Sequence, residues 1–326
     1  MPTETEFVAA AARVAPAFGL DPSDVSILST SENVVCAVTN GDGSRAVMRL
    51  HRSGYNTIEE LNSEVVWVSA LAAHGVPVPS ARPTEDGRFY VPVEIVGEVR
   101  YIGAVEWVRG TPLSDQVGDD NASLLDHYAR IGVIAAQIRR HNELWEPPAS
   151  FLRRRWDADG FMGTAPLWGR FWDVDAASVG QRRLFATART AIHTELSALS
   201  TGPDRFGLIH SDLHLGNLMA DGDRLTVIDF DDSGFGWFAH ELAVALHSVL
   251  ETPWEDAARA AMVEGYRSVH ALDEVEERLI DTFLTVRTLM LVGWQDARPE
   301  LPSFANIQTR IAAAARQVER YLELGS

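Results

Sequence analysis

The 326-residue chain contains no lysine, and every one of its 28 basic residues is arginine. It holds a single cysteine, Cys36, which excludes an internal disulfide and suits a reducing compartment. No apolar run is long enough to span a membrane, and the first residues, with Glu4 and Glu6 but no basic group, lack the pattern of a signal peptide. From these absences we expect a cytoplasmic protein that does not enter the membrane.

Common phosphate-binding signatures are also missing, because the sequence has neither a Gly-x-Gly-x-x-Gly motif nor a Walker A motif. A formal net charge of -18 would repel nucleic-acid phosphates, so the three consecutive arginines at 153–155 do not predict a nucleic-acid partner. They are assigned to solvation, or to a crevice that meets an acidic group of a substrate. The chain is 46% hydrophobic, which is enough for two lobes with real cores.

Residues 207–232 carry the strongest functional signal, with the sequence GLIHSDLHLGNLMADGDRLTVIDFDD. His210, Asp212 and Asn217 keep the His-x-Asp-x-x-x-x-Asn spacing of a phosphoryl-transfer catalytic loop, in which the Asp accepts a hydroxyl proton and the Asn holds magnesium. A short apolar strand from Arg224 then ends at Asp229, after a turn at 221–223. This order predicts Asp212 as the base and Asn217 and Asp229 as the Mg2+ ligands, since magnesium prefers hard oxygen ligands.

Two plainer interpretations of this segment were weighed. Asp, Asn and Gly are common in turns, and a single His-x-Asp match arises by chance in many chains. His210 and His214 could instead suggest a metal site of softer ligands, but only Asp212 lies between them as a third ligand. The combination of loop, spacing, strand and second Asp favours phosphoryl transfer, with His210 shaping the loop through backbone hydrogen bonds.

The segment from His210 to Asn217, together with Ile228-Asp-Phe-Asp-Asp232 and the following Ser-Gly-Phe-Gly, resembles the aminoglycoside phosphotransferase superfamily. Within it the chain looks most like the bacterial stress-response Ser/Thr kinase branch, near homoserine kinase-like and choline kinase-like enzymes. The resemblance implies an α+β, two-lobed protein-kinase-like fold with a small β-rich lobe and a larger, mainly helical lobe. We expect lobes at 1–105 and 112–326, joined by a hinge at 106–111.

The amino-terminal third supports a nucleotide lobe, because two β-rich runs flank the turn signal Asn-Gly-Asp-Gly at 40–43. The resemblance implies that ATP is the phosphate donor. It places Arg49 where a strand lysine binds the α and β phosphates, and Glu64, on a helix expected from Ile58 to His74, as its partner. The turn that contains Ser31 and Asn33 would cover the nucleotide. Glu106 and Val108 flank the segment whose backbone would meet adenine.

Arg49 itself departs from the lysine of the family and could be taken as a sign of lost activity. A chain without lysine would replace even a phosphate-binding one, and a guanidinium keeps its charge and offers a bidentate fork to phosphate oxygens. A nucleotide-binding pseudokinase is therefore the weaker alternative. A Ser/Thr protein kinase is the other alternative to a small-molecule kinase.

The acceptor is predicted as a hydroxyl-bearing small molecule, such as an amino alcohol or an aminoglycoside. Acidic and aromatic groups beyond the metal loop would suit an amine through charge and cation–π contacts. By position the candidates are Asp232, Trp237, Glu241, Trp294 and Asp296. The plainer interpretation is that such Trp residues fill the core, and that Glu241 supports the catalytic loop in place of the Asp that the family has there.

Overall fold

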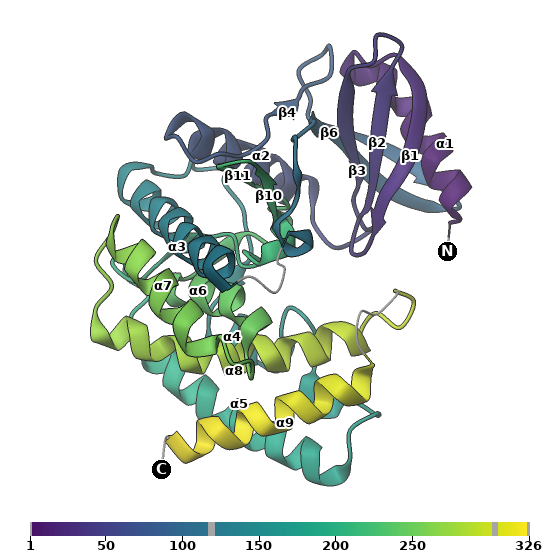
Figure 1. The fold of residues 1–326 in the computed structure, drawn as a ribbon. Helices are drawn as coiled ribbons and strands as arrows, with labels where there is room; N and C mark the ends of the chain where they lie inside the picture. Colours follow the sequence, from purple (N-terminus) through teal and green to yellow (C-terminus); the bar gives the residue numbers. More distant parts are fainter. Residues whose placement is uncertain (1, 117–120, 302–305, 325–326) are drawn as a thin grey trace. The chain divides into compact units, whose positions relative to one another are not determined.

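A computed structural model describes residues 2–116, 121–301 and 306–324, and the chain in it forms two compact units (Figure 1). The first unit comprises Met1–Thr111, Pro147–Arg153 and Met219–Asp231, and the second comprises Pro112–Glu146, Arg154–Leu218 and Asp232–Ser326. The sequence had led us to expect two contiguous lobes. Segments 147–153 and 219–231 belong to the first unit because they form hydrogen bonds with its other residues.

A six-stranded sheet forms most of the first unit. Its strands are ordered β1-β2-β3-β6-β4, with β5 also paired to β6, and all the pairs are antiparallel. The strands are β1 (Pro22–Thr30), β2 (Val34–Asn40), β3 (Arg45–Leu50), β4 (Ala81–Arg82), β5 (Tyr90–Ile95) and β6 (Glu98–Glu106). The predicted hairpin is confirmed: Asn40 and Gly43 lie in the turn between β2 and β3, where Gly43 takes a φ of 82° that favours glycine.

Two helices accompany this sheet. Helix α1 (Glu4–Val14) lies beside the strands of this sheet (Figure 1) and leads into the 3-10 turn η1 (Ala15–Phe18). The buried side chains of α1 and η1 pack with those of the strands in one apolar cluster. Helix α2 (Ile58–Ala73) starts at a capping box in which Thr57 and Glu60 exchange side-chain and backbone hydrogen bonds. Leu61 and Val65 of α2 pack against Tyr90, so the helix presents its apolar stripe to the strands as the sequence pattern predicted.

The late segment 219–231 is tied into the first unit by backbone contacts. It contains most of a hairpin of β10 (Leu218–Asp221) and β11 (Arg224–Val227), which continues through β7 (Thr111–Pro112) as a three-stranded sheet. The Val227 amide donates to the Pro77 carbonyl at 2.8 Å. Gly110 lies so close to the Ala220 backbone that a Cβ atom would collide with it, and its φ of 96° also favours glycine.

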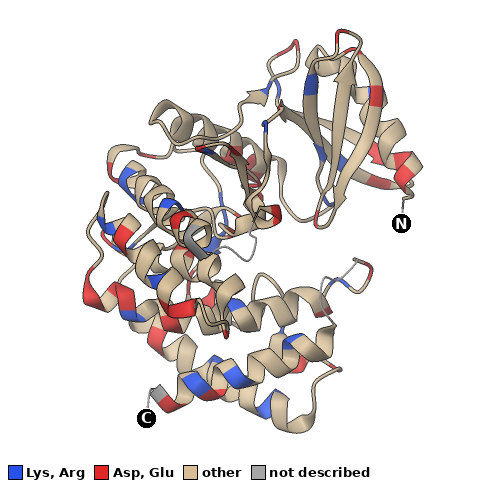
Figure 2. Cartoon of the chain, in the orientation of Figure 1, with Lys and Arg blue, Asp and Glu red and all other residues tan. Residues whose placement is uncertain are grey.

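The second unit is mainly helical. Its helices are α3 (Asn121–Leu144), α4 (Ala158–Met162), α5 (Val179–Ala198), α6 (Phe238–Leu246), α7 (Glu255–Arg267), α8 (Glu274–Asp296) and α9 (Ile307–Leu324), with 3-10 turns η2 (Leu113–Asp115), η3 (Phe171–Asp173), η4 (Leu215–Asn217) and η5 (His247–Val249). Every residue of α6 is buried. Acidic and arginine side chains are interspersed over these helices (Figure 2). In the described residues no helix has the length and apolar character needed to cross a membrane.

A small sheet of the second unit positions the catalytic loop. Strand β12 (Gly234–Trp237) runs between β8 (Arg155–Trp156), with which it is parallel, and β9 (Phe206–Ile209), with which it is antiparallel. The end of β9 leads directly to His210, and β12 leads directly into α6. The loop is thus held at one end by a paired strand and faces a fully buried helix.

Candidate active site

The catalytic loop is fixed to α6 by one carboxylate. Glu241 accepts hydrogen bonds from the backbone amides of His210 and, at 3.1 Å, of Ser211. Ser211 has a φ of 67°, which is unusual for a residue with a side chain and is held here by that bond. Burial raises the pKa of Glu241 to about 8, although the two amides oppose the shift. Glu241 therefore has the supporting role, and its oxygens are occupied by the loop.

Asp212 lies in this loop with both carboxylate oxygens engaged. Arg287 Nη2 donates to Oδ1 at 2.5 Å, and Asn217 Nδ2 donates to Oδ2 at 3.0 Å. His214 Nε2 lies 3.4 Å from Oδ2. Burial tends to raise the pKa of Asp212, but His214 and Arg287 outweigh it and hold the pKa well below its usual range. The side chain is 19% exposed, so an ionised carboxylate remains within reach of a small molecule.

Arg287, on α8, is a site residue that the sequence reasoning missed. Its side chain is only 6% exposed, and its guanidinium lies 4.8 Å from the centre of the Trp168 ring. Its Nε and Nη1 are buried and have no hydrogen-bond partner among the described residues. The sequence holds one sign of this role, because Arg287 is the lone arginine in the mainly apolar run 283–292. An arginine is seldom buried without a specific partner.

Asn217 closes the loop in the 3-10 turn η4. Its amide nitrogen donates to the carboxylate and, at 2.9 Å, to the backbone oxygen of Asp212. Because the nitrogen is used in this way, the amide oxygen is left to act as a metal ligand. An amide oxygen is one of the hard ligands that Mg2+ accepts, and this ion takes few protein ligands and completes its shell with phosphate and water.

The predicted cation and its partners meet in the first unit. Arg49 Nη1 lies 3.5 Å from Glu64 Oε1, and Arg49 Nη2 lies 2.5 Å from Asp229 Oδ1 and 3.9 Å from Asp231 Oδ1. Burial opposes the charge of Arg49, but the three carboxylates outweigh it and raise the pKa of the guanidinium. Arg49 thus makes the ion pair with Glu64 that the sequence analysis expected, and the Asp229 side chain, 41% exposed, remains accessible.

The other nucleotide-site candidates also lie in the first unit. Asn33 is buried, and its side-chain oxygen accepts from the Arg52 amide at 3.0 Å, so it braces the turn between β1 and β2. Ser31 is exposed in that turn. Glu106 is the exposed last residue of β6, and Val108 is half-buried just after it.

The acceptor candidates all lie in the second unit and form two groups. Trp237 and Glu241 are buried, whereas Asp232, Trp294 and Asp296 are half-buried or exposed. Trp237 is buried among aromatic side chains, with Nε1 donating to the Ser200 carbonyl at 3.0 Å, so it is a core residue like Glu241 and neither offers a surface to an acceptor. Asp232 pairs with Arg154 at 3.0 Å. Trp294 is half-buried, 6.4 Å from the Trp168 ring, and Asp296 is exposed.

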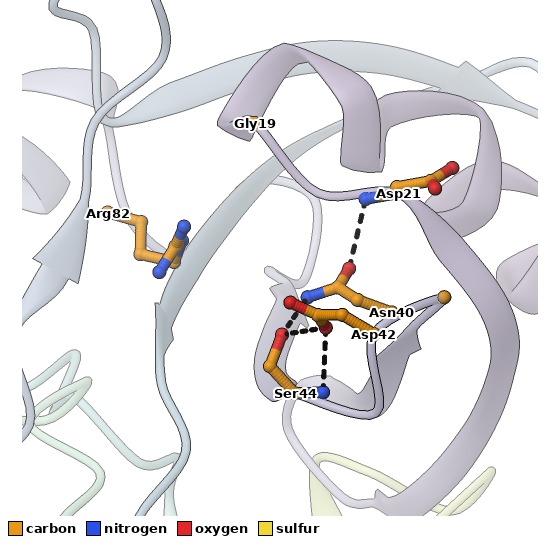
Figure 3. A pocket seen from close by; sticks show the side chains of 7 residues that line it. Gly19, Asp21, Asn40, Asp42, Ser44 and Arg82 are labelled. Carbon is orange, nitrogen blue, oxygen red and sulfur yellow. Dashed lines mark hydrogen bonds between the residues drawn. The ribbon is translucent and has the colours of Figure 1, made fainter.

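A separate hollow of ≈ 330 Å³ lies in the first unit, lined by Gly19, Asp21, Asn40, Gly41, Asp42, Ser44 and Arg82 (Figure 3). Its polar groups bond to one another: Asn40 accepts from the Asp21 amide, and Asp42 accepts from the amide and hydroxyl of Ser44. None of the predicted site residues lines it.

Comparison with known proteins gives the family. The model of the phosphotransferase enzyme family matches residues 25–278. A solved structure of a microcompartment-associated aminopropanol kinase has 32% sequence identity to this chain. The two structures superpose over 97% of each chain with a TM-score of 0.84. Amicoumacin kinase of Bacillus subtilis (strain 168) is 24% identical over 86% of this chain and 82% of its own. An amicoumacin kinase structure in complex with AMP-PNP, Ca2+ and Ami has a TM-score of 0.76 at 19% identity, covering 93% and 90% of the two chains.

The match to the family model and the similarity to the aminopropanol kinase each extend over most of the chain. The β-rich first unit and the helical second unit have the kinase-like architecture of these relatives, so the expected fold class is confirmed. The protein therefore belongs to the phosphotransferase enzyme family and is a phosphotransferase that acts on a hydroxyl group.

Proposed function

We propose that the protein transfers the γ-phosphoryl group of ATP to the hydroxyl of an amino alcohol, with Asp212 as the base. The observation that carries the proposal is the environment of Asp212, an ionised and accessible carboxylate held by Arg287 and Asn217. A hydroxyl within hydrogen-bond reach of it can donate its proton as the oxygen attacks phosphorus. The new O–P bond forms as the bond from phosphorus to the oxygen bridging to ADP breaks, and the hydroxyl proton passes to Asp212.

The first unit, through Arg49 and Asp229, is proposed to bind the nucleotide. Arg49, steadied by Glu64, donates to the α and β phosphates, and the turn at Ser31 and Asn33 covers them. Asn33 acts through its backbone, since its side chain is bonded to Arg52. The backbone beside Glu106 and Val108 meets adenine. Asn217 and Asp229 would hold Mg2+, which would supply positive charge to neutralise that of the phosphates.

The domain roles follow from these assignments. Residues 1–105 form the nucleotide lobe together with segments 147–153 and 219–231, residues 106–111 form the hinge, and the rest of 112–326 supplies the base and the acceptor contacts. Arg49 makes the ion pair expected of an active nucleotide site, which supports an enzyme rather than a pseudokinase. The proposal includes a cytoplasmic location, where ATP is available as the donor.

The preference for an amine rests on charge in the second unit. Asp296 is exposed at the surface but partly desolvated by its neighbours. This partial burial, together with the nearby carboxylates of Asp175 and Asp173, raises its pKa. An ammonium group placed there would relieve this repulsion. The half-buried ring of Trp294 already has the Arg298 guanidinium 5.2 Å from its centre, so the charge of Asp296 carries the preference. The similarity to an aminopropanol kinase supports the same acceptor class. Asp232 is proposed as a weaker acidic contact, because Arg154 already neutralises it.

A matched pair of acceptors tests this proposal. ATP consumption with Mg2+ is measured for 1-amino-2-propanol and 1,2-propanediol, with aminoglycosides, sugars and a generic protein as further acceptors. We expect the amine to be preferred, and Asp296→Asn to raise its KM by about tenfold, as loss of a roughly 1.4 kcal/mol charge interaction would, without affecting the diol. Turnover on protein alone, or an equal KM change for the amine and the diol, would contradict the proposed acceptor class.

A further inference from the structure

Arg153, the first of the three consecutive arginines, is not a solvated residue. Its side chain is 0% exposed, whereas that of Arg155 is 52% exposed. Arg153 Nη2 donates to the Phe230 carbonyl at 3.0 Å and to the Asp231 carbonyl at 2.7 Å, and Nη1 donates to the Glu60 carbonyl at 3.1 Å. A buried guanidinium with this many backbone partners is a structural tie, because each bond is formed away from competing water.

The tie joins α2 to the residues that follow Asp229. The segment before Arg153 is anchored on α2, where the Leu152 amide donates to Ser63 Oγ at 2.9 Å. Arg153 Nη1 also lies 3.7 Å from Glu64 Oε2, on the same helix. The helix that carries the partner of Arg49 is therefore linked through one side chain to residues 230 and 231.

Asp229 needs support of this kind from its neighbours. Its φ of 65° is costly for a residue with a Cβ atom and persists only where the surroundings impose it. Its own side chain is 41% exposed and is paired with Arg49, so the direction of the carboxylate depends on the backbone that follows. That backbone is well fixed: Phe230 packs edge-on against Trp67 at 5.5 Å, and Arg153 holds both succeeding carbonyls.

Charge gives a second reason for an arginine at this position. The carboxylates of Glu64, Asp229 and Asp231 all lie within 4 Å of Arg49, and two of them are buried. One guanidinium cannot neutralise three carboxylates, and uncompensated buried charge is strongly destabilising. Arg153, beside Glu64, supplies a second cation to this group.

We propose that Arg153 is a positioning residue for the metal-binding carboxylate of Asp229, acting through the Phe230 and Asp231 carbonyls and through Glu64. This rests on the proposed role of Asp229. A lysine could keep the charge, but its single ammonium group cannot reproduce the fork that serves three carbonyls at once. The consequence is that metal affinity, and not only stability, depends on Arg153.

The test measures Mn2+ binding to the AMP-PNP complex by electron paramagnetic resonance, in which the protein-bound ion is distinguished from Mn2+·AMP-PNP in solution. The variants are Arg153→Lys and Arg153→Met, with the exposed neighbour Arg155→Met as matched control. We expect the Kd for Mn2+ to rise about 10–100-fold in both Arg153 variants, as for other residues that orient metal ligands. Metal-free AMP-PNP binding should weaken by a smaller factor than Mn2+ binding, because Glu64 also steadies Arg49. Arg155→Met should match the wild type throughout.

A further variant keeps the test decisive if the Arg153 variants do not fold. Ser63→Ala removes the anchor of the Leu152 amide and leaves Arg153 in place, and should raise the Kd in the same direction by a smaller factor. An unchanged Kd in folded Arg153→Lys, or in Ser63→Ala if neither Arg153 variant folds, overturns the inference. Asp229→Ala separates the two claims: if it binds Mn2+ normally, the proposed metal site itself is wrong.

Discussion

The contacts of Asp212 show which features of a single site residue can be predicted from the sequence and which cannot. The sequence predicts Asp212 as the base and Asn217 as a metal ligand, because the motif that relates them spans eight positions of one loop. The structure places the two side chains 3.0 Å apart. Arg287, which binds the other oxygen of Asp212, is 75 positions away, and no local pattern relates the two. The same limit applies to Arg153 and the residues that it holds.

The contact between Arg287 and Asp212 leads to a prediction about turnover. Arg287→Met removes the hydrogen bond to Oδ1 and leaves the carboxylate free to rotate, whereas Arg287→Lys keeps a charge nearby without the planar fork. We expect kcat to fall about tenfold or more in Arg287→Met, as for loss of an orienting contact, and less in Arg287→Lys. Steady-state kinetics at saturating ATP measure this. An unchanged kcat in Arg287→Met would show that the contact does not serve catalysis.

His240 gives a prediction about acid stability. It is fully buried against Phe161 and Phe283, and burial and then Arg287 lower its pKa from 6.5 to about 3. Below pH 6.5 His240 binds a proton in the unfolded chain but stays neutral in the folded chain. The contribution of His240 to the free energy of unfolding is therefore fully present above pH 6.5 and is lost as the pH falls toward 3.

Urea unfolding between pH 6.5 and pH 3 measures this loss. In that window His240→Gln should make the dependence of the unfolding free energy on pH shallower by about 1.4 kcal/mol per pH unit, because the side chain no longer titrates. Identical slopes in the two proteins would mean that His240 is protonated in the folded state.

At the scale of elements, α3 and α7 are the pair whose backbones approach most tightly at glycines. A Cβ atom on Gly132 would collide with the backbone of Met262 and Tyr266, and one on Gly265 would collide with that of Ala129. Gly265→Ala should therefore lower stability by about 1–3 kcal/mol, as over-packing does. A Cβ atom on Gly180, in the first turn of α5, would lie at an ordinary contact distance of 3.9 Å from Ser178 Oγ. Gly180→Ala should therefore be neutral or stabilising by up to about 1 kcal/mol.

Thermal unfolding of the two glycine variants checks this element-scale prediction. Equal melting temperatures for Gly265→Ala and the wild type would mean that α3 and α7 can separate without cost. The comparison with Gly180→Ala matters because an alanine at either position also improves helix propensity, so the difference between the variants isolates the collision.

The elements themselves were largely predictable. The helix expected from Ile58 to His74 is observed as Ile58–Ala73, and the final segment from Ile307 to Leu324 is also a helix. These segments carry a local apolar period, which is visible in sequence. The membership of 147–153 and 219–231 in the first unit was missed, because it is set by hydrogen bonds from Arg153 and Val227 to residues far away in the chain.

At the scale of the whole molecule, the absence of lysine is compatible with the chemistry. Arg139, Arg153 and Arg287 are all buried, and the first two donate to several partners at once. Such positions favour a planar guanidinium over an ammonium. The arginine at position 49 is thus one instance of a property of the entire chain, and it retains the ion pair with Glu64.

We propose that turnover by this phosphotransferase depends on Asp212. The most direct measurement compares transfer of labelled γ-phosphate to 1-amino-2-propanol by the wild type and by Asp212→Asn, with AMP-PNP binding measured in both. We expect turnover to fall by about 10²–10⁴-fold in Asp212→Asn, as is typical of removing a general base, with nucleotide affinity retained. Full turnover by Asp212→Asn would contradict the account.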